Sequence, residues 1–297
     1  MERRYDIDVA VRARARLGEG TVWDSDAQVL WWVDIWSREI HRLEPRTGRH
    51  STWITPREPG SLAPRSNGQG LVVAMGNAFH FFDPGMSTFT RAIEGFAPHL
   101  PARFNDGRTD RQGRFWAGSA YSGEAAPAQT VAGLYRLDRS ARVSCEIDQL
   151  VCSNGLAWSP GGTLMYHADS HSRRIWKWDF DTTTGNIANR RVFVDMEHVG
   201  IPDGATVDAE GCYWVAMWLS GQILRYDPDG ALMTRVSLPA RAPTCCEFGG
   251  ENLDVLYVST ATLQGGSEPI DATDPLAGSL LAIDAGVRGL RSEPYGR

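Results

Sequence analysis

The sequence of 297 residues has no long hydrophobic run and no excess of basic charge. Its longest apolar stretches, such as Val29 to Val33, are much shorter than the roughly 18 residues that a membrane-spanning helix needs. The formal net charge is −6, whereas a protein that neutralises a phosphate backbone carries a surplus of lysine and arginine. We therefore expect a soluble protein that binds neither a membrane nor nucleic acid.

Cysteine is scarce, and the amino terminus lacks the apolar segment of a secretory signal. The five cysteines contain no C-x-x-C pair, which is typical of reduced thiols in the cytosol. Near the amino terminus, Arg12, Arg14 and Arg16 alternate with apolar residues, which is the pattern of a strand with its arginines facing water. These features predict a cytoplasmic protein with a strand, rather than a targeting peptide, at residues 5–17.

Several familiar catalytic motifs are absent as well. The chain has no G-x-S-x-G elbow, no H-E-x-x-H pair, no Walker loop and no G-x-G-x-x-G fingerprint. His167 and His171 are four residues apart, but Leu164 to Ala168 has the pattern of a strand, which argues against a helical metal-binding pair. Any active site must therefore be assembled by the fold from distant parts of the chain.

The chain does contain an internal repeat. Six segments share a turn with Gly or Asp, an apolar and aromatic strand, a polar turn and a second strand, and they begin near residues 29, 70, 113, 162, 211 and 254. This spacing suits one four-stranded propeller blade per repeat. We predict an all-β fold, a six-bladed β-propeller built as a single domain from residues 1–297, with two β-sandwiches as the alternative. Pairing of the strand at residues 5–17 with the last blade would close the ring.

In a propeller, the first strand of each blade lines the central channel, so equivalent positions in the repeats converge on one ring. Counting back about eight to eleven residues from each apolar strand gives six residues with oxygen-bearing side chains: Glu19, Ser61, Asn105, Asn154, Asp203 and Thr244. Two carboxylates and two amides that meet at one axis would repel one another and be poorly solvated unless a cation compensated them. A divalent ion is the simplest one, and the alternative is that these side chains only cap strands and turns.

The segments around these ring residues resemble the senescence marker protein, regucalcin and gluconolactonase family. The resemblance is carried, in chain order, by LGEGTVWD, RFNDGRTDRQGRFWAGS, SNGLAWSPGGTLMYHADS, IPDGATVDAEGCYWVAMW and FGGENLDVLYVST. Members of this family are six-bladed propellers and include lactonases that act on aldonolactones. The resemblance therefore implies a hydrolase that opens the carboxylic ester of a sugar lactone.

The resemblance also implies roles for particular residues. Glu19, Asn154 and Asp203 match the three protein ligands of a divalent metal, which is Ca²⁺, Zn²⁺, Mn²⁺, Mg²⁺ or Fe²⁺. Arg103 and Asn105 match residues that contact the sugar lactone, and Asp106 and Tyr121 are further candidates for substrate binding. The segment after Tyr121 departs from the family pattern, so no particular sugar can be inferred.

We expect Asp203 to be the catalytic base that activates water, with a water on the metal as the alternative nucleophile. The expected substrate is a glucono-, xylono-, arabinono- or galactonolactone. An anionic lactone, for example a sulfonated one bound by Arg57 or Arg65, is one alternative, and a non-catalytic Ca²⁺-binding propeller is another.

Residues 56–61 and 120–130 are expected to form loops over the pocket, and Trp218 is expected to approach it. We expect a monomer or a weak homo-oligomer.

Overall fold

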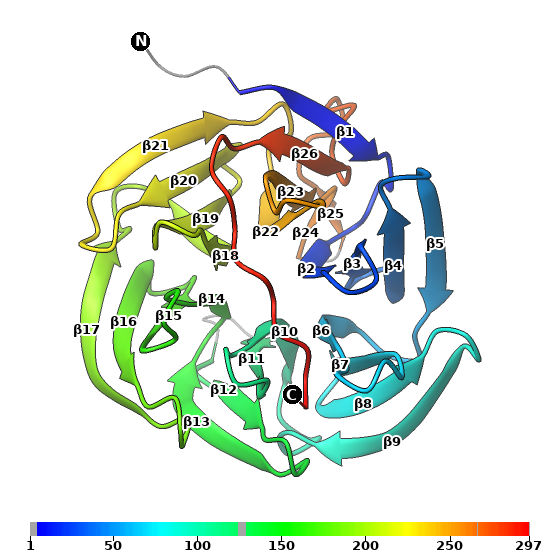
Figure 1. Ribbon diagram of the computed structural model, residues 1–297, viewed down its shortest axis with the longest axis vertical. Coiled ribbons are helices and arrows are strands. Elements are labelled where there is room, and N and C mark those ends of the chain that lie inside the picture. Colours follow the sequence, from blue (N-terminus) through cyan, green and yellow to red (C-terminus); the bar gives the residue numbers. More distant parts are fainter. Residues whose placement is uncertain (1–4, 124–128, 266, 297) are drawn as a thin grey trace.

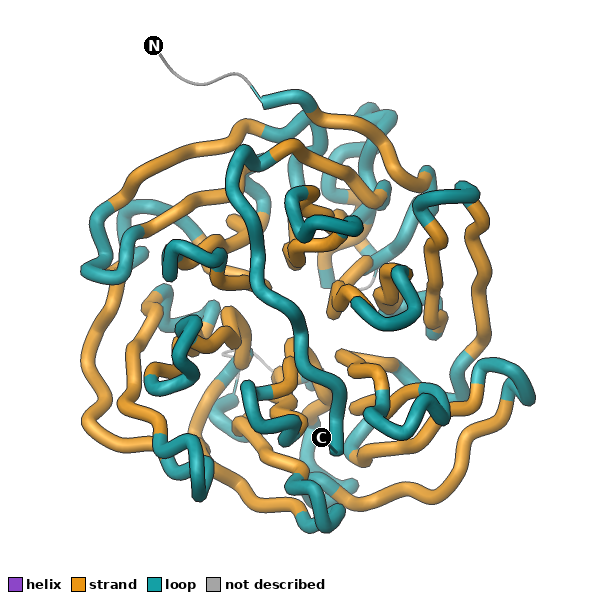
Figure 2. Tube along the Cα trace, viewed as in Figure 1, coloured by secondary structure: helices purple, strands orange, loops and turns teal. Residues whose placement is uncertain are grey.

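The computed structural model describes residues 5–123, 129–265 and 267–296, and its regular structure is entirely β. Six four-stranded antiparallel sheets surround a central axis (Figures 1 and 2), which confirms the predicted six-bladed propeller. No helix of the described residues could cross a membrane. The prediction for residues 124–128, in the middle of the third-blade loop, lies outside the described residues.

In the first five blades, the four strands follow one another from the axis outward. Blade 1 consists of β2 (Gly18–Asp24), β3 (Val29–Asp34), β4 (Glu39–Glu44) and β5 (Arg49–Ile54). Blade 2 consists of β6 (Pro59–Pro64), β7 (Leu71–Met75), β8 (Ala78–Asp83) and β9 (Thr88–Glu94). Blade 3 consists of β10 (Ala102–Thr109), β11 (Phe115–Tyr121), β12 (Ala132–Leu137) and β13 (Val143–Leu150). Blade 4 consists of β14 (Ser153–Trp158), β15 (Leu164–Asp169), β16 (Arg174–Phe180) and β17 (Ile187–Asp195). Blade 5 consists of β18 (Ile201–Val207), β19 (Tyr213–Trp218), β20 (Gln222–Tyr226) and β21 (Leu232–Ser237).

The sixth blade joins the two ends of the chain. It contains β22 (Pro243–Gly249), β23 (Val255–Thr260), β26 (Leu280–Asp284) and, as the outermost strand, β1 (Ile7–Val11). A small hairpin, β24 (Leu263–Gln264) and β25 (Glu268–Pro269), is inserted between β23 and β26. The pairing of β1 with β26 confirms the predicted closure, although β1 is shorter than residues 5–17. Arg12, Arg14 and Arg16 are exposed as predicted, but they follow β1 and do not belong to a strand.

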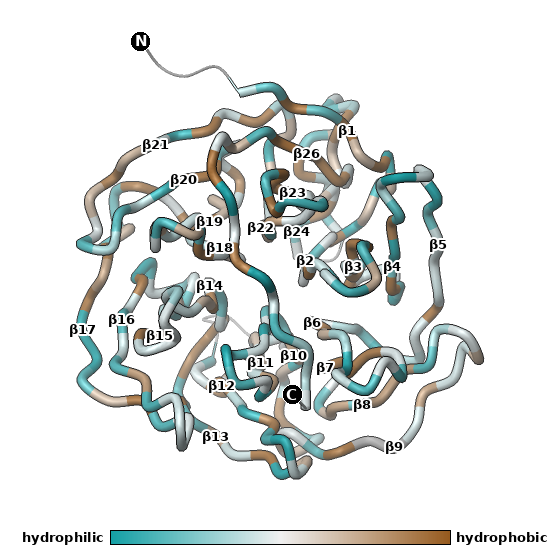
Figure 3. Tube along the Cα trace, viewed as in Figure 1, coloured by the Kyte–Doolittle hydropathy of each residue, from teal (hydrophilic) through white to brown (hydrophobic). Residues whose placement is uncertain are grey.

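The hydrophobic core is divided among the interfaces between blades. Six buried clusters each join two neighbouring blades, and Figure 3 shows hydrophobic residues in the strands of every blade. Between blades 3 and 4, for example, the rings of Trp116 and Trp158 lie 5.7 Å apart. Both side chains are almost fully buried, and truncating such a residue to alanine costs about 3–5 kcal/mol. This packing fixes the blades, and therefore the inner strands, relative to one another.

The segment after β26 crosses one end of the channel (Figure 1). Gly289 forms a bridge with Asp208 after the inner strand of blade 5, and Tyr295 forms one with Arg65 after the inner strand of blade 2. Tyr295 is buried, and its hydroxyl donates to the carbonyl of Asp138 at 2.9 Å. This end of the channel is therefore covered. Arg65 lies at this covered end, directly after β6, whereas the ring residue Ser61 lies near the start of β6.

All five cysteines are free, as predicted from their spacing. Cys212, Cys245 and Cys246 are buried, which confirms the expectation that the adjacent pair consists of small core residues. Burial raises the pKa of the Cys246 thiol to about 12, so the thiol stays protonated at neutral pH.

A stacked pair of histidines in blade 1 predicts acid sensitivity. His41 stacks on Trp32 and on His50, and its burial lowers the pKa of His41 to about 4. His50 opposes protonation of His41, and Asp34 weakly favours it. Because the folded-state pKa lies below the unfolded value of 6.5, the stabilising contribution is complete above pH 6.5. It is lost as the pH falls toward 4.

We expect the free energy of unfolding to fall by roughly 2 kcal/mol more in the wild-type protein than in His41→Phe between pH 7 and pH 5. Phenylalanine keeps an aromatic ring against Trp32 but cannot take up a proton. Urea unfolding at the two pH values measures the difference. Parallel losses in both proteins would show that His41 does not titrate in this interval.

Candidate active site

The six predicted ring residues all lie on the innermost strand of their blade. They occur on β2, β6, β10, β14, β18 and β22, and each side chain is at least 93% buried. In all six blades the ladder to the second strand is interrupted by a bulge or irregularity at or next to the ring residue. Such an interruption turns side chains out of their regular alternation, so the ring residues can point to the axis. In blades 1 and 4, Gly20 and Gly155 follow the ring residue at φ values of 59° and 64°, where a side chain would be strained.

The two ring carboxylates, Glu19 and Asp203, are both buried and repel each other electrostatically. Burial, followed by the negative charge of Asp106, raises the pKa of Glu19 to about 8. Burial, followed by the charge of Glu19, raises the pKa of Asp203 well above its usual range. The site is therefore short of positive charge.

A chain of hydrogen bonds orders the amides of the ring. Arg103 Nη1 donates to Asn105 Oδ1 at 2.8 Å, and Asn105 Nδ2 donates to Asn154 Oδ1 at 2.8 Å. Asn154 Nδ2 in turn donates to Ser170 Oγ at 2.8 Å, and Ser170 Oγ donates to the carbonyl of Pro202 at 2.6 Å. The chain runs across blades 3, 4 and 5 and ends next to Asp203. It fixes the direction of the Asn154 side-chain oxygen.

A cavity of about 300 Å³ opens above the ring. Its lining includes the predicted residues Glu19, Arg103, Asn105, Asn154 and Asp203, together with Trp218, which confirms that Trp218 reaches the pocket. The remaining lining residues are Leu17, Val151, Cys152, Ser170, His171 and Ile201. The cavity thus has a polar floor and a partly apolar wall, which suits a small polar ligand.

Arg103 is the cationic group of this cavity. It is partly buried, its guanidinium lies 4.8 Å from the ring of Trp36, and its Nε has no hydrogen-bond partner among the described residues. Burial lowers the pKa of Arg103, which nevertheless stays charged at neutral pH. Within the part of the chain that the structure describes, Arg103 forms no salt bridge with a carboxylate. Its remaining donors are free to bind a ligand.

Two predicted substrate-binding residues lie away from the cavity lining. Asp106 is buried and accepts a hydrogen bond from the backbone N–H of Leu156 at 3.0 Å. Tyr121 ends β11, and its backbone N–H donates to the carbonyl of Val151 at 2.8 Å. Among the described residues, none from 56–61 or 120–123 lines the cavity. Pro59 to Ser61 belong to β6, and Ala120 and Tyr121 to β11, so the predicted loops are shorter than expected.

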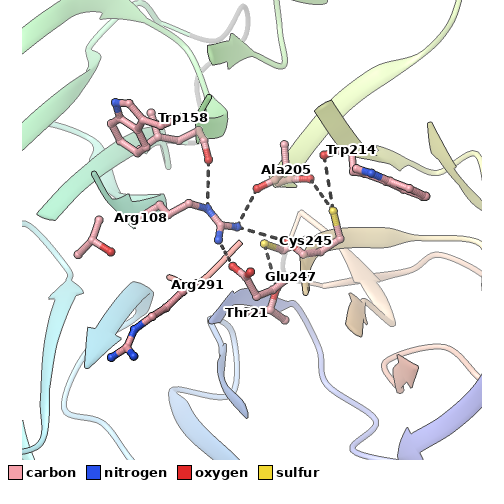
Figure 4. A network of polar contacts seen from close by, with 12 residues as sticks. Thr21, Arg108, Trp158, Ala205, Trp214, Cys245, Glu247 and Arg291 are labelled. Atoms are coloured by element: carbon pink, nitrogen blue, oxygen red, sulfur yellow. Dashed lines mark hydrogen bonds and ion pairs between the residues drawn. The ribbon is translucent and has the colours of Figure 1, made fainter. Parts of the chain in front are cut away.

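Below the ring, a buried ion pair fills the channel. Arg108 from blade 3 forms a salt bridge with Glu247 of blade 6, as Figure 4 shows. Its guanidinium also donates to the carbonyls of Leu156 at 3.2 Å and Ala205 at 2.7 Å, in blades 4 and 5. Neither residue of this pair was among the predicted site residues. Arg108 and Glu247 each follow a ring residue by three positions, so the same counting along the repeats would have found them.

The donor set of the ring fits a hard divalent cation. Two carboxylates and one amide oxygen meet in a buried position, and Glu19 and Asp203 have no salt-bridge partner among the described residues. Ca²⁺, Mg²⁺ and Mn²⁺ prefer oxygen ligands of this kind. A third carboxylate, Asp106, lies near Glu19, and oxygen atoms of the two residues lie within 4.8 Å of each other. A cation would relieve the repulsion among these groups.

The fold and site define a six-bladed β-propeller with an acidic, oxygen-lined pocket at the open end of its axis. Residues 17–262 match the SMP-30/Gluconolactonase/LRE-like region, and the chain belongs to this family. It is 36% identical over 286 residues to a 6-deoxy-6-sulfogluconolactonase of Pseudomonas putida, an alignment that covers 95% of this chain and 96% of the relative. It is 34% identical over 292 residues to regucalcin of Danio rerio, with coverages of 97% and 98%.

The similarity extends to solved structures. The structure of a regucalcin from Agrobacterium tumefaciens, described as a calcium-binding protein, matches with a TM-score of 0.89 at 27% identity. The match covers 99% of this chain and 98% of that one. The family predicted from the sequence motifs is therefore confirmed.

Proposed function

We propose that this protein is a sugar lactonase that depends on one divalent metal ion. The observation that carries the proposal is the buried group of Glu19, Asn154 and Asp203 at the floor of a cavity that also contains Arg103 and Asn105. Such a floor suits metal-assisted chemistry, and the arginine and amide suit the hydroxyl groups of a sugar. Family membership and the lactonase among the relatives support the proposal.

Glu19, Asn154 and Asp203 would hold the ion through side-chain oxygens, with Ca²⁺, Mg²⁺ or Mn²⁺ suited best by the donor set. A divalent ion supplies Lewis acidity, which stabilises the negative charge that develops on an ester carbonyl oxygen. Ca²⁺ is favoured among these ions by the calcium-binding relative. Asn105 keeps the oxygen of Asn154 in place through its hydrogen bond.

The protein's own residues would carry the proton and orient the sugar. Arg103 would donate hydrogen bonds to oxygen atoms of the lactone and place its ester group beside Asp203. Asn105 would accept a hydrogen bond from a sugar hydroxyl through Oδ1, because its N–H groups already donate to Ser153 and Asn154. Asp203 would accept a proton from the attacking water in addition to its role as a metal ligand. The new C–O bond forms, the ring C–O bond breaks, and the ring oxygen takes up a proton. The product is the open-chain aldonic acid. Asp106 and Tyr121 stay predictions for substrate binding.

A panel of lactones tests this function. Gluconolactone, xylonolactone, arabinonolactone and galactonolactone would be offered to the metal-loaded protein, and acid release would be followed by titration at constant pH. We expect at least one lactone to be hydrolysed well above its spontaneous rate. If all stay at background while the protein still binds Ca²⁺, the protein is a calcium-binding propeller without this activity.

A second candidate substrate is an anionic lactone. It is favoured by the guanidinium of Arg103, which has no carboxylate partner among the described residues, and by the relative named a 6-deoxy-6-sulfogluconolactonase. Arg65 cannot contribute, because it lies at the covered end of the channel. Comparing kcat/KM for 6-deoxy-6-sulfogluconolactone and for gluconolactone distinguishes the two candidates. A preference for the neutral sugar would exclude the anionic one.

Replacing Arg103 by glutamine is expected to raise KM for the lactone by about tenfold or more, with a smaller change in kcat. The reason is that a charged hydrogen bond to the substrate contributes about 1.5–3 kcal/mol to binding. Steady-state kinetics measure the change. Arg38→Gln is the matched control, since Arg38 forms an exposed ion pair with Glu58 outside the cavity lining. An unchanged KM in Arg103→Gln would exclude Arg103 from substrate binding.

A further inference from the structure

Two buried aspartates stand at equivalent positions in blades 1 and 4. Asp34 is the last residue of β3 and pairs with Gly18, the residue before Glu19. Asp169 is the last residue of β15 and pairs with Ser153, the residue before Asn154. Their exposed fractions are 1% and 6%. Blades 1 and 4 lie across the channel from each other (Figure 1), and each carries one proposed metal ligand.

The two aspartates make the same hydrogen bonds. In blade 1, Asp34 Oδ2 accepts from the backbone N–H of Arg16 at 2.8 Å, and Oδ1 accepts from those of Leu17 at 3.0 Å and Ser37 at 3.1 Å.

In blade 4, Asp169 Oδ2 accepts from the N–H of Val151 at 3.4 Å. Its Oδ1 accepts from those of Cys152 and His171, both at 3.1 Å. In each blade, the carboxylate therefore holds the two N–H groups that lie three and two residues before the proposed metal ligand.

The other four blades lack this arrangement. In blades 3, 5 and 6 the residues that pair with the one before the ring residue are Ser119, Met217 and Thr260, and the second strand of blade 2 ends at Met75; none of them is a carboxylate. Blades 1 and 4 are thus distinguished from the others both by the aspartate and by a glycine at positive φ after the ring residue.

We propose that Asp34 and Asp169 are positioning residues, which act through the backbone to hold Glu19 and Asn154 in the geometry for binding a metal ion. This inference rests on the proposed metal site. A buried carboxylate that accepts three N–H groups fixes the segment leading into β2 or β14, and the next residues place the ligand at the axis. The same contacts shape the pocket wall, because Leu17, Val151, Cys152 and His171 line the cavity.

The test compares the metal affinity of Asp34→Asn, Asp169→Asn and a matched control, Asp110→Asn. Asparagine keeps the shape of aspartate but turns an NH₂ group toward one of the backbone N–H groups. Asp110 is fully buried and accepts the N–H groups of Gln112 at 2.9 Å and Arg114 at 3.0 Å. It also forms a salt bridge with Arg114 and accepts a hydrogen bond from Trp116 Nε1 at 3.1 Å. Because Asp110 follows β10 at the covered end of the channel, its loss should cost stability at least as much as the other two changes without reaching the ring.

Calorimetric titration of each metal-free protein with Ca²⁺ and with Mn²⁺ gives the dissociation constants, and thermal unfolding shows that each variant is folded. We expect Asp34→Asn and Asp169→Asn to bind about 10- to 100-fold more weakly than the wild type. Asp110→Asn should bind as the wild type does, although its melting temperature falls. Equal affinities in all folded variants would overturn the positioning role and leave the proposed function intact. Absence of binding to the wild type would overturn both.

A conservative variant keeps the test valid if an asparagine variant fails to fold. Asp34→Glu and Asp169→Glu retain the acceptor charge, and we expect them to recover part of the lost metal affinity. Alanine at the same positions removes the acceptor altogether. If a folded glutamate variant bound Ca²⁺ no more tightly than the folded alanine variant, the positioning role would be overturned.

Discussion

Replacing Asp203 by asparagine is expected to lower kcat/KM for lactone hydrolysis by about a thousandfold, because the variant loses the group that accepts a proton from water. The same change removes one of the two ring carboxylates, so the affinity for a divalent ion should fall as well. Measuring kcat at saturating metal separates the two effects. A loss of kcat that persists at saturating metal identifies Asp203 as a base.

Ser61→Ala is the matched control for this variant. Ser61 is a ring residue with a fully buried side chain, and its hydroxyl has no hydrogen-bond partner among the described residues. It is not one of the proposed metal ligands, so kcat/KM should change by less than about threefold. If Asp203→Asn retained wild-type kcat once the metal site was filled, Asp203 would be only a ligand, and a different base would have to be found.

Replacing Glu19 by glutamine should have opposite effects on metal binding and on the stability of the metal-free protein. We expect the dissociation constant for a divalent ion to rise by at least about a hundredfold, since a charged ligand becomes neutral. In the metal-free protein, glutamine removes one of three neighbouring buried carboxyls, which repel one another and are costly to desolvate. The melting temperature of the metal-free variant should therefore exceed that of the metal-free wild type.

Calorimetry and thermal unfolding on the same samples measure both effects. Metal raises the stability of a protein that binds it, and at a concentration of 100 times the dissociation constant the gain is about 2.7 kcal/mol. The wild type should therefore be stabilised by added Ca²⁺ and the variant hardly at all. A metal-free variant that is less stable than the metal-free wild type would show that Glu19 serves the fold rather than the metal site.

Much of the fold could be predicted because each blade corresponds to one repeat of the sequence. Each blade has to bury its strands against both neighbours, so a similar pattern of apolar and aromatic strands recurs about every 45 residues. The positions of Glu19, Asn154 and Asp203 followed from the phase of that repeat. The closing strand was predicted only in part, because β1 ends at Val11 and the alternating arginines follow it.

The rest of the site depends on contacts between distant segments, which local patterns do not reveal. His171 and Ser170 reach the cavity from the turn after β15, whereas the predicted residues Tyr121 and Asp106 do not line it. Bulges decide these directions, and a shift of one residue moves a side chain to the other face of its strand. The segment that covers the channel after β26 has no counterpart in the repeat, and its role became visible only in the structure.

The most direct test of the central claim is to measure lactone hydrolysis while one divalent ion is returned to the protein. The protein would be stripped with a chelator, freed of the chelator, and titrated with Ca²⁺ or Mn²⁺ in the presence of the best lactone. The account predicts no hydrolysis above background in the stripped protein, and a rate that rises until one ion is bound per chain. Full activity of the stripped protein would contradict it.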